Sequence, residues 1–140
     1  MGLRFTKFHG LGNDYLNWLD KWRENLQMGL TTWAETSDVS TTRSDCHAWG
    51  ASPNIEFLRT VVGIDSDAPG FSRIKVQPHP GTLTNIKSEM PHPMGKISAE
   101  YLKKNDRWSF TLDLPAGLTG SLVWAGKSYP LKPGKNMFTL

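Results

Sequence analysis

The sequence predicts an α+β fold in which two N-terminal helices precede an antiparallel β-sandwich. Two observations carry this prediction. Apolar residues recur at helical spacing before Gly63, and short alternating runs between turn residues replace them afterwards. The 140 residues are 38% hydrophobic and 21% charged, which is the balance of a globular chain rather than of a disordered one.

The first predicted helix covers residues 15–28. Leu16, Leu19 and Leu26 recur at helical spacing, so they share one face of this helix. Asp14 is expected to cap its N-terminus, because an aspartate side chain can accept a hydrogen bond from the free backbone N–H groups there. Gly29 is expected to end the helix.

The second predicted helix covers residues 53–62. Pro53 suits its first turn, because a proline at that position loses no helical hydrogen bond. Ser52 is expected to cap this helix, and Gly63 is expected to end it.

After a linker expected at residues 65–71, seven short runs alternate between apolar and polar residues. Turn residues separate these runs, and several short strands at close spacing are typical of an all-β sandwich. A polar hairpin tip is expected at residues 103–107. The predicted strands cover residues 72–77, 82–89, 95–103, 107–114, 120–124, 127–131 and 136–140.

Charge and cysteine content narrow the function classes. The formal net charge is +3, and the four cationic residues from Lys96 to Arg107 lie among strand-like residues, which favours a solvated face over a nucleic-acid surface. No run approaches the roughly 18 apolar residues that a membrane span needs, and residues 1–15 lack the apolar core of a signal peptide. Because Cys46 is the one cysteine, the sequence excludes an internal disulfide and a multi-thiolate metal site.

No cofactor or metal site is expected. The four histidines are scattered along the sequence, and Asp65 and Asp67 alone offer too few oxygen ligands for calcium. His79 and His92 each stand between two prolines, which predicts exposed loops at both positions.

Residues 30–52 form a long polar segment without helical or strand periodicity. Glu35 and His47 lie 12 residues apart within it, near Trp33 and Trp49 respectively, and a loop allows both to face one pocket. Glycoside hydrolysis needs one carboxylate that activates water and a second carboxyl group that protonates the leaving oxygen, and tryptophan can stack on a sugar ring. On residue types alone, a solvated loop acid and a hydrogen-bonded structural histidine are the favoured alternative.

Two motifs in this segment, TTWAE at residues 31–35 and RSDCHAWGASP at residues 43–53, resemble the C-terminal end of the α-L-rhamnosidases, glycoside hydrolase family 78. The resemblance covers residues 15–140. It implies that residues 16–64 are the last helices and active-site loop of an (α/α)6 catalytic barrel, and that residues 65–140 are a C-terminal β-sandwich domain. The barrel of that family removes terminal α-L-rhamnose by inverting hydrolysis.

The same resemblance implies roles for single residues. Glu35 would be the general base that activates water, and His47 would contact the bound rhamnose. Trp33 and Trp49 would help to shape the substrate pocket. The implied partner is a rhamnose-containing glycan of the parent enzyme.

The resemblance also implies that this chain has no glycosidase activity by itself. The general acid of the family lies in earlier barrel segments that these 140 residues do not contain, so an inverting site would lack half of its acid–base pair. The alternative is a non-catalytic carbohydrate-binding or structural β-sandwich module. Self-association is also expected, because two helices outside a complete barrel leave apolar surface exposed.

Residues 1–15 fit neither unit and resemble the amino terminus of diaminopimelate epimerase. The similar segment is RFTKFHGLGND followed by Tyr15, and by motif Asn13 would be the residue that touches substrate. That epimerase needs two cysteines, whereas this chain has only Cys46, in an unrelated context. Residues 1–15 are therefore expected to be a leader or fusion segment.

Overall fold

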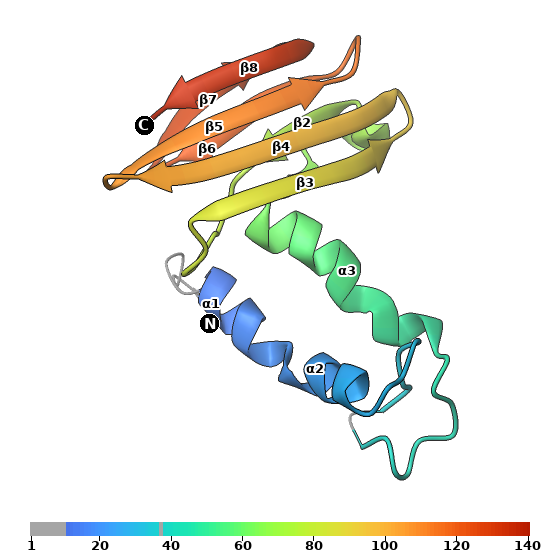
Figure 1. Ribbon diagram of the computed structural model, residues 1–140. Coiled ribbons are helices and arrows are strands. Elements are labelled where there is room, and N and C mark those ends of the chain that lie inside the picture. Colours follow the sequence, from blue (N-terminus) through green and yellow to red (C-terminus); the bar gives the residue numbers. More distant parts are fainter. Residues whose placement is uncertain (1–10, 37) are drawn as a thin grey trace, which may run out of the picture.

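The computed structural model describes residues 11–36 and 38–140, so most of the epimerase-like segment lies outside the described residues. A helical unit lies at one end of a sandwich of two β-sheets (Figure 1). This arrangement confirms the α+β class with a β-sandwich. The helices occupy the first part of the chain and the strands occupy the rest.

The first predicted helix is divided into α1 (Leu11–Trp18) and α2 (Asp20–Gln27). Asp14 is inside α1 rather than at its start, so the predicted cap is wrong. Gly29 ends α2 as predicted, since its φ is +78°. The N–H of the next residue, Leu30, then donates to a carbonyl five residues back, at 3.0 Å, which closes the helix end.

The second predicted helix is α3 (Ser52–Glu56), which widens into a π-helical turn, η2 (Phe57–Val61). A 3₁₀ turn, η1 (Ala48–Ala51), leads directly into α3. Ser52 therefore lies within the first turn instead of capping it, and no side chain makes a capping hydrogen bond there.

The sandwich consists of two four-stranded sheets among the described residues, with strand orders β1-β2-β6-β7 and β3-β4-β5-β8. All seven predicted strands are present, with ends shifted by a few residues. β1 was not predicted, because it begins just before the expected linker. The strands are β1 (Ile64–Ser66), β2 (Arg73–Val76), β3 (Asn85–His92), β4 (Gly95–Lys104), β5 (Arg107–Leu114), β6 (Thr119–Trp124), β7 (Lys127–Leu131) and β8 (Gly134–Thr139).

Strand pairing is antiparallel except between β2 and β6, which run parallel in the part of the chain that the structure describes. The segment between these two strands forms the β3-β4-β5 meander of the other sheet. β4 and β5 are joined by a two-residue turn at Asn105 and Asp106, whose φ angles of +47° and +60° match the right-handed twist of a tight hairpin. The predicted hairpin tip is thereby confirmed.

His92 corrects the expectation of exposed loops around the two Pro-His-Pro segments. It is the last residue of β3 and only 8% exposed. Its Nδ1 accepts the N–H of Met94 at 3.1 Å, so its Nε2 carries the proton and donates to the carbonyl of Phe71 at 2.8 Å. Both ring nitrogens are therefore used within the fold.

The core between the sheets is aromatic and aliphatic. Phe110 is 1% exposed and lies 5.2 Å from Tyr101 and 4.9 Å from Trp124, measured between ring centroids. Trp108 packs edge-on against Trp124 at 5.6 Å. Burial of these large side chains supplies the main driving force for folding of the sandwich.

The end of the helical unit is built into this core. Val61, Val62 and Ile64 are fully buried. The Tyr101 hydroxyl of β4 donates to the Val62 carbonyl at 3.0 Å, and the N–H of Gln77 donates to the Gly63 carbonyl at 2.8 Å. Burial raises the pKa of Tyr101, so this hydroxyl remains a donor.

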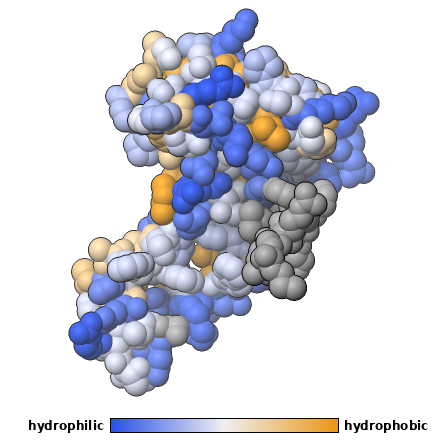
Figure 2. All heavy atoms as spheres, turned by 180° about the vertical axis from the view of Figure 1, so that it is seen from behind, coloured by the Kyte–Doolittle hydropathy of each residue, from blue (hydrophilic) through white to orange (hydrophobic). Residues whose placement is uncertain are grey.

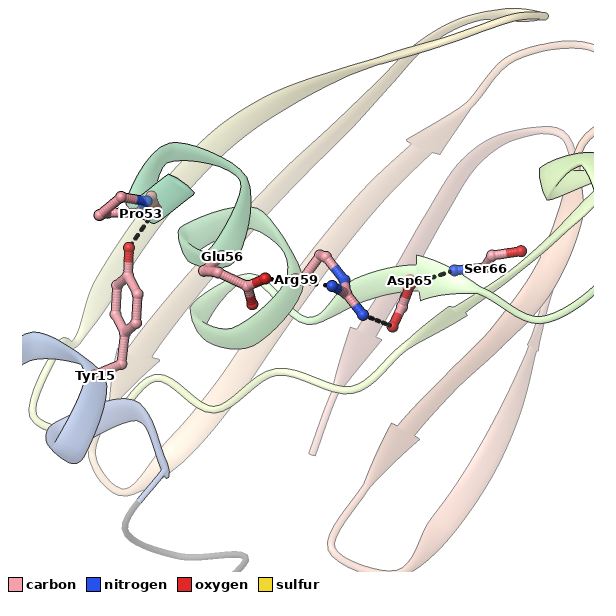
Figure 3. A network of polar contacts seen from close by, with 6 residues as sticks. All are labelled: Tyr15, Pro53, Glu56, Arg59, Asp65 and Ser66. Carbon is pink, nitrogen blue, oxygen red and sulfur yellow. Dashed lines mark hydrogen bonds and ion pairs between the residues drawn. The ribbon is translucent and has the colours of Figure 1, made fainter. Parts of the chain in front are cut away.

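A polar network links the helices and the first strand on the surface (Figure 3). The hydroxyl of Tyr15 donates to the Pro53 carbonyl, which ties α1 to α3. Arg59 pairs with Glu56 at 3.3 Å and with Asp65 of β1 at 3.2 Å. These ion pairs are half-exposed, so each adds little stability, and the orientation of the helices depends mainly on buried contacts.

Some apolar side chains of the helical unit remain on the surface, and hydrophobic patches are interrupted by hydrophilic residues when the molecule is seen from behind (Figure 2). Self-association through them stays a prediction. No helix among the described residues has the length and apolar character to cross a membrane. The exposed apolar side chains of the helical unit and its loop are Trp18, Leu26, Met28, Trp49 and Ile55.

Gly63→Ala is expected to lower the free energy of unfolding by about 3 kcal/mol or more. A Cβ at this position would lie 2.2 Å from the carbonyl carbon and oxygen of Gln77, and the φ of Gly63 is +82°. Gly126→Ala is the matched control, since its φ is +76° with no atom within 4 Å, and it should cost only about 1 kcal/mol. Urea denaturation measures both, and equal losses would show that the close approach to Gln77 is unimportant.

Candidate active-site loop

The segment between the helices folds back on itself, so its two motifs lie side by side. The N–H of Glu35 donates to the Ser44 carbonyl at 2.9 Å, and the N–H of His47 donates to the Trp33 carbonyl at 2.8 Å. The Thr32 hydroxyl adds a bond to the carbonyl of Asp45. Backbone pairing therefore brings together two residues that are 12 positions apart in the sequence.

Glu35 and His47 line one pocket of about 460 Å³. Helix α2 supplies a wall of this pocket, and the indole N–H of Trp22 fixes that wall to the loop by donating to the Gly50 carbonyl at 2.7 Å. The remaining lining residues are Lys21, Trp22, Asn25, Ala34, Thr36, Trp49 and Gly50.

Gly50 allows the two parts of the loop to approach closely. A Cβ at this position would lie 2.7 Å from the Ala34 carbonyl oxygen and 2.9 Å from the Cβ of Trp33. Any larger residue would push the two motifs apart, so the geometry of the pocket depends on this glycine.

Arg43 pairs with Glu35 and favours its ionised form. Its Nε donates to the Glu35 carboxylate at 3.1 Å, and a second guanidinium nitrogen contacts the other carboxylate oxygen. The Glu35 side chain is 18% exposed, whereas that of Arg43 is 84% exposed. The hydrogen bonds from Arg43 lower the pKa of Glu35 below its ordinary value, with partial burial opposing them and the charges of Arg43 and His47 adding to them. Glu35 is therefore ionised at neutral pH.

The two tryptophans near these residues have different positions. Trp49 lines the Glu35 pocket and is 83% exposed, so its ring is available to a ligand. Trp33 instead lines a neighbouring pocket of about 410 Å³, together with Tyr15, Trp22 and Phe57.

The sequence reasoning missed several residues that border the Glu35 pocket. Lys21, Trp22 and Asn25 were not considered as site residues, although their spacing along α2 places them on one helix face. Arg43 belongs to the second motif, but only the folded loop shows that it pairs with Glu35. The spacing of Lys21, Trp22 and Asn25 along one helix face is the sequence feature that could have identified the α2 residues.

A second, larger groove lies on the sandwich and has a volume of about 1000 Å³. Trp108 and Trp124 border it together with Lys103 and the segment around Pro80. Trp108 is 8% exposed and largely belongs to the core.

The Glu35 pocket offers acid–base and hydrogen-bonding chemistry. An ionised carboxylate can accept a proton from water, and an imidazole can bond to hydroxyl groups. Glu35 is the only carboxylate among the described residues that line the pocket, so they supply one member of a carboxyl pair. No three His, Cys, Asp or Glu side chains are grouped as metal ligands within residues 11–36 and 38–140.

The chain resembles three solved structures over most of its length. The match to α-L-rhamnosidase from Streptomyces avermitilis complexed with L-rhamnose covers 85% of this chain, with a TM-score of 0.72 and 16% identity. The match to native α-L-rhamnosidase from Aspergillus terreus also covers 85% of this chain, with a TM-score of 0.73 and 18% identity. The match to α-L-rhamnosidase from Dictyoglumus thermophilum covers 83% of this chain, with a TM-score of 0.66 and 18% identity. The chain spans only 14%, 15% and 17% of those three chains, respectively, so the likeness concerns the fold of one part of each protein.

No curated protein sequence matches the chain. The model of the bacterial alpha-L-rhamnosidase C-terminal domain matches residues 63–137, which run from the Gly63 junction into β8 and make up more than half of the chain. The chain therefore belongs to the bacterial alpha-L-rhamnosidase C-terminal domain family.

Proposed function

We propose that this chain is the C-terminal portion of a glycoside hydrolase that removes terminal α-L-rhamnose by inverting hydrolysis. In this proposal, residues 16–64 contribute the active-site loop of the catalytic barrel, residues 65–140 are the β-sandwich domain, and residues 1–15 are a leader or fusion segment. The observation that carries the proposal is the shared pocket of Glu35 and His47.

Glu35 is proposed as the general base. In an inverting reaction the base removes a proton from water while the water oxygen attacks the anomeric carbon, and an acid on the other side protonates the leaving oxygen. The hydrogen bonds from Arg43 favour the ionised form of Glu35, which is the form that a base needs. Each carboxylate oxygen has a second lone-pair direction, so a water molecule can bond to Glu35 without displacing Arg43.

His47 and Trp49 are proposed to bind the sugar. His47 lines the pocket with Glu35 and its imidazole can bond to sugar hydroxyls, while the exposed indole of Trp49 offers an apolar face. L-Rhamnose is a 6-deoxy sugar, so it presents both hydroxyls and an apolar methyl group. Trp33 is proposed to shape the pocket indirectly, because its carbonyl holds the N–H of His47.

Titration with L-rhamnose tests the binding half of this proposal. The amide resonances of residues 33–35 and of His47 are expected to shift, and these shifts should be lost in His47→Ala. His79→Ala is the control, because His79 lies outside the loop and its replacement should leave these shifts unchanged. Shifts confined to residues after Ser72 would contradict the proposal and favour the alternative, a carbohydrate-binding sandwich module whose groove is bordered by Trp108 and Trp124.

The 140-residue polypeptide by itself is expected to release no aglycone from an aryl α-L-rhamnoside. Glu35 lacks a second carboxyl group among the described pocket residues, so nothing there protonates the leaving oxygen. Release is followed by absorbance over many hours at high protein concentration. Turnover that disappears in Glu35→Gln would show that the chain carries a complete site, and the prediction of inactivity would then be wrong.

Arg43→Gln is expected to raise the pKa of Glu35 toward its ordinary value, because it removes the main hydrogen-bond donor and a positive charge. In the unsubstituted chain the pKa of Glu35 is lowered. The pairing with Arg43 therefore stabilises the fold at pH values above the ordinary pKa of glutamate, and this stabilisation is lost as the pH falls through the lowered pKa. Titration of the Glu35 carboxyl carbon by NMR measures the change. Arg59→Gln removes a guanidinium that pairs with Glu56 and Asp65, so it should leave the pKa of Glu35 unchanged.

A further inference from the structure

Asn25 is a buried polar residue for which the fold itself gives no use. It lies near the end of α2, is 5% exposed and lines the Glu35 pocket. Its backbone carbonyl accepts the N–H of Leu30, but its carboxamide makes no hydrogen bond to another residue that the structure describes. The carboxamide is also not sealed from solvent, since the side chain of Ser88 holds the only fully enclosed, unpartnered polar atom among the described residues.

This position is unfavourable for folding in two respects. The Asn25 carboxamide is largely removed from bulk water and gains no protein partner in exchange, whereas most buried polar groups in native proteins are bonded. Asparagine is also a poor helix former, because its side chain competes with the backbone for hydrogen bonds. A residue that costs stability and faces a pocket is typical of a binding site rather than of a structural one.

The part of α2 that carries Asn25 is held against the loop. Trp22, one turn earlier on α2, is bonded through its indole to the Gly50 carbonyl at 2.7 Å, so the helix wall is fixed to the loop. Lys21 on the same helix is paired with the exposed Glu24 at 3.2 Å. The carboxamide of Asn25 is the neutral group on this wall that can both donate and accept a hydrogen bond.

We infer that Asn25 is a sugar-binding residue of the Glu35 pocket and that its carboxamide bonds to two adjacent hydroxyl groups of the ligand. One carboxamide has an acceptor oxygen and a donor nitrogen side by side, and two neighbouring hydroxyls present a donor and an acceptor at similar spacing. A neutral partner fits better than an anion, because the carboxylate of Glu35 lines the same pocket. The inference rests on the proposed function, because it takes the ligand of this pocket to be a sugar.

The test compares Asn25→Ala with Asn17→Ala, in the whole chain. Asn17 is an exposed asparagine on α1, so its replacement measures the gain in helix propensity alone. Urea denaturation should show that Asn25→Ala is at least as stable as Asn17→Ala, because no native bond is lost. Binding of L-rhamnose, followed by amide shifts, should weaken about three- to tenfold in Asn25→Ala only. In the unsubstituted chain the side-chain NH₂ signals of Asn25 should shift when L-rhamnose is added.

The outcomes separate this inference from the proposed function. If Asn25→Ala is clearly less stable than Asn17→Ala, the carboxamide is structural and the inference is wrong, whatever the pocket binds. If L-rhamnose shifts the Glu35 and His47 signals equally in both variants, the proposed function stands and the role of Asn25 is refuted. If the sugar produces no shift in the pocket of the parent chain, both are refuted.

Discussion

The position of the helical unit depends on the short junction from Val61 to Ile64, where the chain leaves a helix and enters a sheet. Three of these four residues are fully buried side chains, and the fourth is a glycine in the left-handed region. The carbonyl of Val62 accepts the buried Tyr101 hydroxyl, while that of Gly63 accepts a backbone N–H beside β2. Carbonyl groups at a helix end would otherwise lack hydrogen-bond donors. The sandwich supplies these donors, and the buried side chains of the junction complete its core.

The loop that carries Glu35 and His47 is held less firmly. Its own backbone bonds and the Trp22 bond to Gly50 define the pocket, whereas most of its side chains are exposed or half-exposed. On one side the loop joins the sandwich through α3 and η2, and on the other side α2 leads back to α1, which approaches the segment around His79 and Gly81. The unit that matches the family model and the unit that carries Glu35 therefore differ in what stabilises them: a closed aromatic core in one, and a few directed hydrogen bonds in the other.

Local patterns predicted most of the fold. The β4–β5 hairpin was predictable because alternating residues flank a polar tip, and Gly29 and Gly63 were predictable because helix ends need a left-handed residue. β1 is only three residues long, which is too short for an alternation to be seen. The parallel pairing of β2 with β6 joins segments more than forty residues apart, and no local signal encodes that choice.

The candidate site was predictable only in part. Residue types in the two motifs suggested Glu35 and His47, and the folded loop places both at one pocket. Arg43 and Asn25 carry no distinguishing local pattern, since their importance comes from what lies opposite them after folding. Trp33 and Trp49 have the same residue type, and composition alone cannot tell which of the two faces the pocket of Glu35.

The bond between Tyr101 and Val62 has a consequence for biosynthesis. The helices and the loop between them leave the ribosome before the sandwich, but the hydroxyl that secures the end of the helical unit belongs to a residue 39 positions after Val62. During translation the buried side chains at the junction have no core to enter until β4 has emerged and paired. The junction from Val61 to Ile64 therefore lacks its support until the strands that provide it have been synthesised.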